Sequence, residues 1–246
     1  MYAAHFDQFN IVRLIQVPLG NYVDDNLVIL TNSSMMMGLA VIIIYLLLRG
    51  DKLIPNRWQF VMELIHLNIR LVVYDNLGKA GQKYFPFVLC LFLFIVVLNV
   101  LGLFPYVFTP TVHIIVTFGL SLSIVMGVTL LGFFIFKFNF LSILMPAGAP
   151  LGLAPALVIV EVLSYVSRAI SLGVRLAANL IAGHLLFTII SGFAFNMLIN
   201  GLVVLSFFPI LIMTFITLLE MAVAVIQAYV FCLLTAIYLG DTVALH

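Results

Sequence analysis

Long uninterrupted apolar segments constrain this chain more than any other feature. A helix rises 1.5 Å per residue, so about 20 mostly apolar residues are needed to cross roughly 30 Å of hydrocarbon. Five segments are long enough, and they occupy 27–48, 84–107, 111–136, 156–198 and 202–239. The chain is 65% hydrophobic and only 8% charged, against about 25% charged in soluble proteins. The sequence therefore predicts an all-α integral membrane protein with a single membrane domain over 1–246.

The last two segments are too long to stand upright in a bilayer. As a helix, 156–198 would be about 65 Å long, roughly twice the hydrocarbon thickness. The stretch 146–155 before it holds three prolines and two glycines, which break helices. A further break is expected near Asn200 and Gly201. We therefore expect two long, steeply tilted helices after an organisational boundary.

A polar stretch separates the first two apolar segments. Within it, 58–76 alternates apolar and charged residues, which predicts an amphipathic helix lying at the membrane interface. The region also carries most of the 10 Lys and Arg of the chain, namely Arg49, Lys52, Arg57, Arg70, Lys79 and Lys83. Basic loops face the negative compartment, so alternation puts the N-terminus on the positive side and the C-terminus on the negative side. Residues 1–25 carry no pattern of an import or secretion signal.

Charge and motif content exclude several function classes. The net charge is only +1, so no basic surface for nucleic acid is expected. Cys90 and Cys232 lie in apolar runs without the spacing of a disulfide or metal site. HExxH, GxSxG and Walker sequences are absent. We therefore expect no catalytic residues, no metal and no cofactor in this chain.

The first long segment carries a polar stripe. Its members recur every three or four residues, which places them on one helical face. They are Glu161, Ser164, Arg168, Ser171, Arg175 and Asn179. A charged side chain at bilayer depth costs about 2.5–3.5 kcal/mol on insertion scales, so it indicates a partner or a task. The stripe is either a polar seam between packed helices of this chain or a functional surface.

Arg175 is the most informative member of the stripe. Its guanidinium stays protonated, so it can act only as a fixed cation and never as a link in a proton relay. No carboxylate lies within one helical turn of it in the sequence. Small residues flank it, among them Gly173 and Ala177, and these allow another backbone to approach, although ordinary packing explains them equally well.

The second long segment places Glu220, Gln227, Leu234 and Asp241 seven residues apart, again roughly on one face. The alternation of spans puts Glu220 and Gln227 toward the positive side, at the depth of His184. It puts Asp241 on the negative side, at the depth of Glu161. Two sets of titratable groups are thus expected on opposite sides of one permanent cation. A lone buried His is more often structural than functional, and for His184 by itself the two roles are equally open.

These residues resemble a known family. The segment SRAISLGVRLAANLIAGH at 167–184 resembles the signature of subunit a of F-type ATP synthases, in the mitochondrial form. The segment LEMAVAVIQAYVFCLLTAIYL at 219–239, with Asp241, resembles its C-terminal helix, and weaker similarity covers 10–106 and 146–155. His184 and Glu220 stand where bacterial relatives have the two residue types exchanged. The short acidic C-terminal end resembles fungal members.

The resemblance implies a stator subunit of a rotary motor, with rotor c subunits, other membrane-sector and peripheral-stalk subunits, and lipid as partners. Arg175 would face a rotor carboxylate and separate two half-channels. Asn179, His184, Glu220 and Gln227 would line the first, and Glu161 and Asp241 the second, with Ser171 and Arg168 in secondary roles. The implied location is the mitochondrial inner membrane, with the N-terminus in the intermembrane space and the C-terminus toward the matrix.

Two other classes are open. A proton-coupled secondary transporter also uses broken helices and midplane charges, but it should show internal repeats, and none is visible. An intramembrane enzyme is suggested only by Glu63 and His66, which are spaced like half of a di-iron motif. A single copy on an interfacial helix is more typical of a solvated face.

Overall fold

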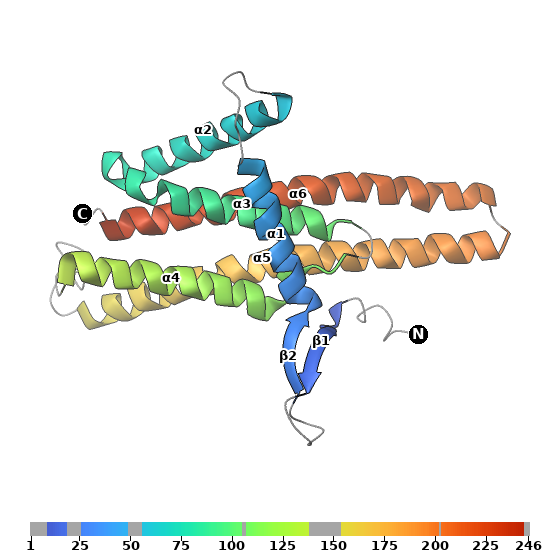
Figure 1. Cartoon of the computed structure of the whole chain (residues 1–246), viewed down its shortest axis with the longest axis horizontal. Helices are drawn as coiled ribbons and strands as arrows, with labels where there is room; N and C mark the ends of the chain where they lie inside the picture. The colour runs from blue at the N-terminus through green and yellow to red at the C-terminus, as the bar shows by residue number, and fades with distance from the viewer. Residues whose placement is uncertain are drawn as a thin grey trace. The chain divides into compact units, whose positions relative to one another are not determined.

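The computed structural model describes residues 9–18, 26–48, 56–104, 107–137, 154–201 and 203–243. Six α-helices dominate these residues, accompanied by one two-stranded sheet and two short 3-10 helices (Figure 1). In chain order the elements are β1 (Arg13–Pro18), β2 (Asn26–Thr31), α1 (Asn32–Leu48), α2 (Arg57–Leu77), η3 (Lys79–Tyr84), α3 (Phe85–Gly102), η4 (Pro110–Val112), α4 (Ile114–Phe136), α5 (Ala154–Ile199) and α6 (Val203–Val243). The expectation of an all-α membrane protein whose last two helices are long is confirmed.

Within the described part of the chain, four helical segments are long and apolar enough to cross a membrane. They are Gly81–Gly102, Ile114–Phe136, Ala156–Ile199 and Val203–Thr242. Helix α5 has 46 residues, which corresponds to about 69 Å and exceeds the hydrocarbon thickness as expected. Pro155 lies inside the first turn of α5 and not before it, because a helix tolerates proline where its N–H would have no partner. The rest of the proline-rich stretch, 146–153, lies outside the described residues.

The first expected span differs from the structure. Residues 27–31 belong to strand β2, which pairs antiparallel with β1, and helix α1 begins only at Asn32. The Asn32 side chain accepts hydrogen bonds from the backbone N–H groups of Ser33 and Val12, and so fixes the start of the helix beside the hairpin. With 17 residues, α1 is about 25 Å long and is a shorter apolar helix than the four spans.

The chain divides into two compact units. Unit 1 comprises Met1–Arg49, Leu93–His113 and Ala177–Gln227, and unit 2 comprises Gly50–Phe92, Ile114–Leu176 and Ala228–His246. The single membrane domain expected from the sequence stays a prediction.

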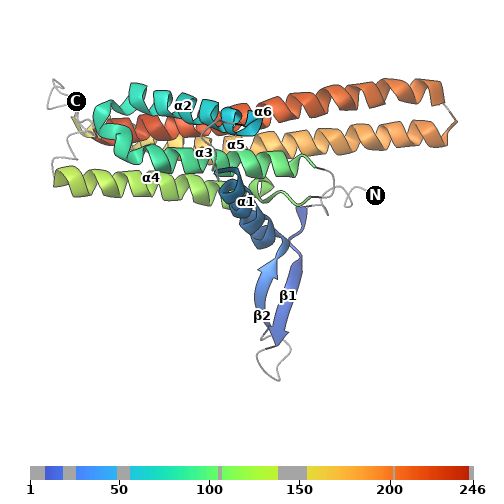
Figure 2. The same cartoon turned by 45° about the horizontal axis from the view of Figure 1, so that its top comes forward.

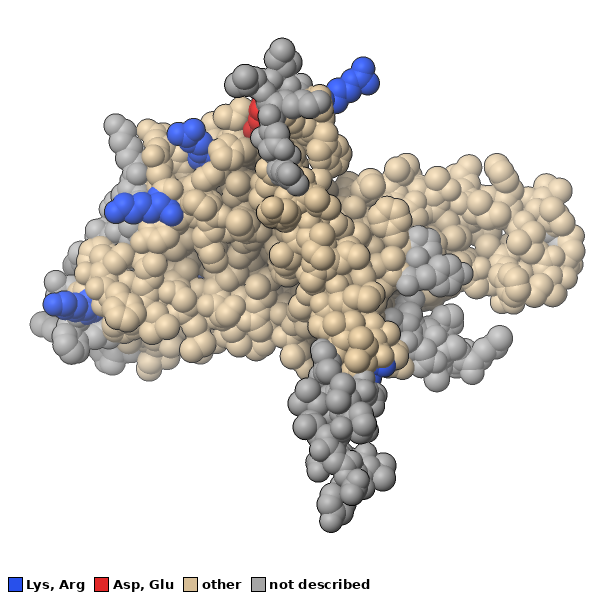
Figure 3. All heavy atoms as spheres, viewed as in Figure 1, with Lys and Arg blue, Asp and Glu red and all other residues tan. Residues whose placement is uncertain are grey.

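A helical hairpin is the main feature of unit 1. The second half of α5 and the first half of α6 run antiparallel and side by side (Figures 1 and 2). They are joined at Gly201, whose φ of 77° is readily adopted by glycine. The expected break near Asn200 is therefore in place. Asp, Glu, Lys and Arg are absent from 176–219. The face of this hairpin that is visible in Figure 3 accordingly shows no blue or red atoms.

Unit 2 contains α2, η3, α4, the start of α3, the first half of α5 and the end of α6. Helix α2 covers the amphipathic segment expected at 58–76, with one further residue at each end. Its buried side chains are Ile69, Val72, Val73 and Leu77. Gly173 of α5 packs against α4 so closely that a Cβ there would lie 2.6 Å from Ser121 Oγ and 2.9 Å from Phe118 Cα. This small residue lets the two helices approach.

Candidate functional site

Polar side chains of α5 and α6 meet within unit 1. Asn179 Nδ2 donates a hydrogen bond to Gln227 Oε1 at 3.0 Å, across the two helices. Gln227 is buried, whereas Asn179 is exposed. Burying a polar amide without a partner would cost roughly 1–3 kcal/mol, so this bond accounts for the tolerance of Gln227 in an apolar helix. Two residues predicted to share a half-channel are therefore in direct contact.

His184 lies farther along α5 and reaches the loop before η4. Its Nε2 is 3.4 Å from Thr109 Oγ1, and its ring meets that of Phe9 edge to face with centroids 6.0 Å apart. Both contacts are within unit 1. The imidazole is thus half-buried and held by one polar and one aromatic neighbour. Thr109, which is 4% exposed, was not singled out by the sequence reasoning.

Glu220 occupies a tight place opposite Gly183. A Cβ added at Gly183 would collide with the Glu220 carboxylate, approaching Oε1 most closely and lying 2.8 Å from Cδ. Glu220 Oε1 is buried and has no hydrogen-bond partner among the described residues. A buried acceptor of this kind is costly to leave unsatisfied, which makes it a candidate for binding water or a proton. The absence of a side chain at Gly183 is what gives the carboxylate its place.

A cavity of about 20 Å³ joins these groups. One water needs about 10–15 Å³, so the space suits a single water at a time. All of the lining residues belong to unit 1, and they are Asn99, Leu103, Asn179, Leu180, Gly183, His184, Glu220, Val223, Ala224 and Gln227. The four residues predicted for the first half-channel, Asn179, His184, Glu220 and Gln227, therefore line one cavity.

Asn99 belongs to this cavity and was missed by sequence reasoning. It is fully buried on α3, its Nδ2 donates to the backbone oxygen of Ala224 at 3.3 Å, and its Oδ1 has no partner among the described residues. The signal that could have identified it is its position, because an amide inside an apolar span is uncommon and needs a partner. Asn99 lies outside the two long segments whose polar spacing predicted the other residues of this cavity.

A second set of polar residues lies in unit 2. Arg168 Nη1 and Asp241 Oδ2 are 3.9 Å apart, and the two side chains are 44% and 58% exposed. The expectation paired Asp241 with Glu161 at the same depth. In the structure the ion pair of Asp241 is with Arg168, whereas Glu161 is half-buried and forms no ion pair among the described residues. Attraction between opposite charges accounts for the contact of Asp241 with Arg168. That Glu161 and Asp241 lie at the same depth stays a prediction.

Arg175 is exposed on the opposite side of α5 from the packed face. The packed face in unit 2 consists of Ala169, Leu172, Gly173 and Leu176, all buried. Arg168, Ser171 and Arg175 are exposed, and Arg175 Nη2 donates only to Ser171 Oγ, at 3.3 Å. Among the described residues no carboxylate lies within ion-pair distance of Arg175. The alternative of a polar seam between packed helices of this chain is therefore not favoured at Ser171 and Arg175, whereas Arg168 contacts Asp241 of α6.

Comparison with known proteins gives a consistent result. A family model described as "ATP synthase A chain" matches residues 31–240. The chain is similar to "ATP synthase subunit a" of Metridium senile, with 64% identity and complete coverage of both chains. It is also similar to the proteins of that name from Marchantia polymorpha, at 42% identity with both chains fully covered, and from Emericella nidulans, at 39% identity over 98% of this chain and 96% of the other. The fungal resemblance of the C-terminal end thus does not extend to overall identity.

Proposed function

The chain belongs to the ATP synthase A chain family and is a membrane-sector subunit of an ATP synthase, and we propose that it is the stator through which protons reach and leave a ring of rotor c subunits. The single observation that carries the proposal is the exposed guanidinium of Arg175. It lies within an apolar span and has no carboxylate partner among the described residues. Because an unpaired cation at bilayer depth is costly, a partner acid on another subunit is expected to offset it.

The rotor carboxylate supplies that acid in the proposed mechanism. A deprotonated carboxylate is attracted to Arg175, and a protonated one is neutral enough to pass through lipid as the ring turns. Since the guanidinium cannot release its proton, it blocks direct transfer between the two half-channels. Each proton that crosses 100 mV releases about 2.3 kcal/mol, and this block directs that energy into rotation.

The uptake half-channel is assigned to the cavity of unit 1. Glu220 and His184 exchange protons, and the Asn179–Gln227 pair and Asn99 hold water in hydrogen-bonding reach. This assignment is supported by the unpartnered Glu220 Oε1 and by space for one water beside it. Protons pass from here to the rotor carboxylate near Arg175, which lies one helical turn before Asn179 on α5.

The release half-channel is assigned to Glu161 and Asp241 in unit 2, with Arg168 and Ser171 in supporting roles. Arg168 holds Asp241 through an exposed ion pair, and Ser171 orients the Arg175 guanidinium. Because the Arg168–Asp241 pair is exposed, it is worth only about 0–1 kcal/mol and can open as a proton passes. In this proposal the chain itself performs no bond-making chemistry on ATP, because that chemistry takes place elsewhere in the complex.

The cellular location is inferred from the relatives, the apolar helices and the basic region around α2. The relatives come from an animal, a plant and a fungus, and several helices are apolar enough to span, which supports a multi-pass protein of the mitochondrial inner membrane. The basic region around α2 supports an orientation with the matrix on that side, the N-terminus in the intermembrane space and the C-terminus toward the matrix. Accessory partners are the other membrane-sector and peripheral-stalk subunits.

A proton-coupled transporter is the weaker alternative. Such a protein needs a substrate site near the midplane, whereas the cavity that Glu220 and Gln227 line has room for about one water. Family membership also favours the stator role.

The proposal is tested by replacing Arg175 with alanine in the assembled complex. Arg175→Ala should abolish ATP-driven proton pumping into membrane vesicles, because the two half-channels would no longer be separated. Arg168→Ala is the matched control from the same helix and should cause a much smaller loss, since it removes only an exposed ion pair. Normal coupled pumping by an assembled Arg175→Ala complex would exclude the stator role.

A further inference from the structure

A cavity beside α2 has no part in the proposed proton path. It lies within unit 2 and has a volume of about 150 Å³, which is roughly ten times the space that one water needs. Its lining residues are His66, Arg70, Val73, Tyr74, Gln82 and Phe85. The spacing of His66 from Glu63 resembles half of a di-iron motif, but the sequence contains no second copy that would complete such a site. Its surroundings now suggest a different role.

Two glycines after α2 form the turn next to this cavity. Gly78, with a φ of 63°, ends the helix and donates its N–H to Tyr74 O at 2.9 Å. Gly81 lies against the Leu77 side chain, where a Cβ would find no room. The chain therefore turns sharply into η3, which brings Gln82 and Phe85 to the α2 face. The His66 ring meets Phe85 edge to face, with centroids 4.7 Å apart.

The lining has the chemistry of an anion site with an apolar extension. Arg70, His66, Tyr74 and Gln82 all carry N–H or O–H donors, and no carboxylate lines the cavity. A guanidinium binds phosphate oxygens through two parallel hydrogen bonds. Val73 and Phe85 supply apolar walls. Basic residues also outnumber acidic ones in the sequence 57–84, which contains Arg57, Arg70, Lys79 and Lys83 but only two carboxylates, Glu63 and Asp75.

The position of the cavity along the chain indicates the membrane surface. The first long apolar span begins at Gly81, so Gln82 and Phe85 stand where that span enters the bilayer. Helix α2 meanwhile leaves Leu64, Leu67 and Leu71 half exposed or more, as an interfacial helix does. We propose that this cavity binds the phosphate group of an anionic phospholipid, with Arg70 on the phosphate and the first acyl carbons against Val73 and Phe85.

Free inorganic phosphate has the same anionic chemistry, but it would make no use of the apolar walls or of the interfacial position. Lipid is therefore the occupant to which the geometry points. Binding of a lipid headgroup here would also fix the turn between α2 and α3, because one ligand contacts residues on both sides of Gly78.

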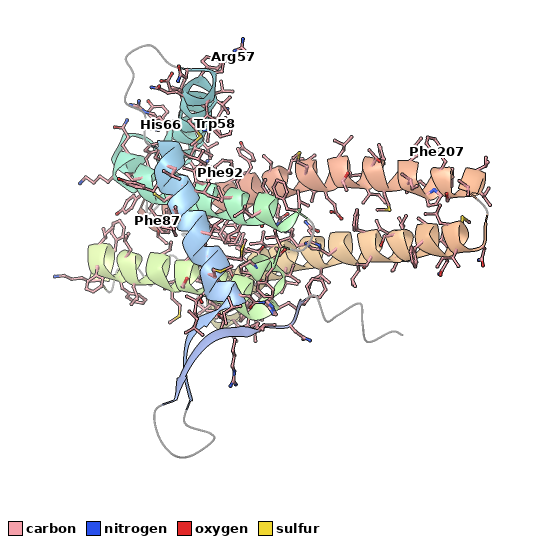
Figure 4. All side chains as sticks on the ribbon, turned by 45° about the vertical axis from the view of Figure 1, so that its right-hand side comes forward. Arg57, Trp58, His66, Phe87, Phe92 and Phe207 are labelled. Atoms are coloured by element: carbon pink, nitrogen blue, oxygen red, sulfur yellow. The ribbon has the colours of Figure 1, made fainter. Side chains whose placement is uncertain are left out.

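The test uses the whole purified complex in nanodiscs doped with a photoactivatable phosphatidylglycerol. Labelled peptides from 66–85 are quantified by mass spectrometry, with a phosphatidylcholine carrying the same photoactivatable chain as the comparison. Arg70→Gln should lower phosphatidylglycerol labelling of these peptides about tenfold, in keeping with the loss of a charge-assisted pair. Arg57→Gln is the matched control. Arg57 lies at the N-terminal end of α2, apart from His66 (Figure 4), and about 20 Å along the helix from Arg70.

The expected pattern is reduced labelling in Arg70→Gln, native labelling in Arg57→Gln, stronger labelling by phosphatidylglycerol than by phosphatidylcholine, and no effect of added inorganic phosphate. Equal labelling of the native and Arg70→Gln complexes, or equal labelling by the two lipids, would overturn the proposal. Displacement of the lipid by millimolar inorganic phosphate would overturn the lipid assignment in favour of a free-phosphate site. If Arg70→Gln fails to assemble, Gln82→Leu must show the same reduction, and native labelling in that variant would refute the site.

Discussion

The contact between Gly183 and Glu220 gives the sharpest test of the uptake half-channel. Gly183→Ala adds one methyl group and changes no charge. That methyl would lie 2.8 Å from Glu220 Cδ and 3.2 Å from Cγ, and closer still to Oε1. Carbon atoms in contact stand about 3.5–4.0 Å apart, so the carboxylate must move by roughly half an ångström or more. The adjoining cavity of about 20 Å³ offers little room for this movement without loss of its water.

The size of the effect follows from packing energetics. Inserting a methyl group into a filled site costs about 1–3 kcal/mol. If that cost falls on proton transfer at Glu220, it corresponds to about a 5- to 150-fold slower rate, at 1.36 kcal/mol for each factor of ten. Gly192→Ala is the matched control on the same helix, because a Cβ at Gly192 has nothing within 4 Å. It should leave the proton flux unchanged.

The assay is passive proton flux, together with gradient-driven ATP synthesis, in proteoliposomes that contain equal amounts of assembled complex. Gly183→Ala should slow both, whereas Gly192→Ala should match the native complex. Equal rates in the two alanine variants would show that proton transfer at Glu220 does not depend on the space at Gly183, and would contradict the prediction. Equal losses in both would show a general effect on α5 instead of one on Glu220.

Three further predictions concern single side chains. Glu220→Gln should slow gradient-driven synthesis by about tenfold or more at unchanged assembly, because an amide cannot exchange a proton, and an unaltered rate would remove Glu220 from the path. Gly173→Ala should destabilise the complex by about 1–3 kcal/mol, because the added methyl group would meet Ser121 and the α4 backbone. Gly127→Ala on α4 is the control and should not destabilise it, because a Cβ there has open space around it. The two variants are compared by the resistance of the complex to heating in detergent. Asn99→Leu should lower proton flux while assembly persists, because the cavity loses a polar wall, and native flux in this variant would make Asn99 purely structural.

Apolar segment length predicted most of the helices. The bounds of α2, α4, α5 and α6 differ from the expected ones by at most four residues, because each helix coincides with a continuous apolar or amphipathic segment. Larger differences occur at the end of α3, which is Gly102 instead of residue 107, and at the start of α1. Hydropathy alone does not distinguish an apolar strand from a helix, and β2 is an apolar strand whose partner, β1, lies earlier in the sequence.

Helical spacing predicted which polar residues share a face, but not which of them touch. The heptad spacing of Glu220 and Gln227 placed them together, and the cavity of unit 1 contains both. The hydrogen bond from Asn179 to Gln227, the ion pair from Arg168 to Asp241 and the contribution of Asn99 depend on how neighbouring helices are offset along their axes. That offset is set by close-packed positions such as Gly173 and Gly183, and no periodicity within one helix encodes it.

In the proposed motor, the Arg175 face of α5 meets the rotor helix that carries the partner carboxylate. Ala178 is exposed near Arg175, whereas the adjacent Ala177 is fully buried. Ala178→Cys and Ala177→Cys, each in a Cys90→Ala background because Cys90 is exposed, can be oxidised against a cysteine placed beside the rotor carboxylate. A disulfide-linked product is expected with Ala178→Cys and none with Ala177→Cys. A crosslink from Ala177→Cys alone, or from neither position in an assembled and oxidised complex, would contradict it.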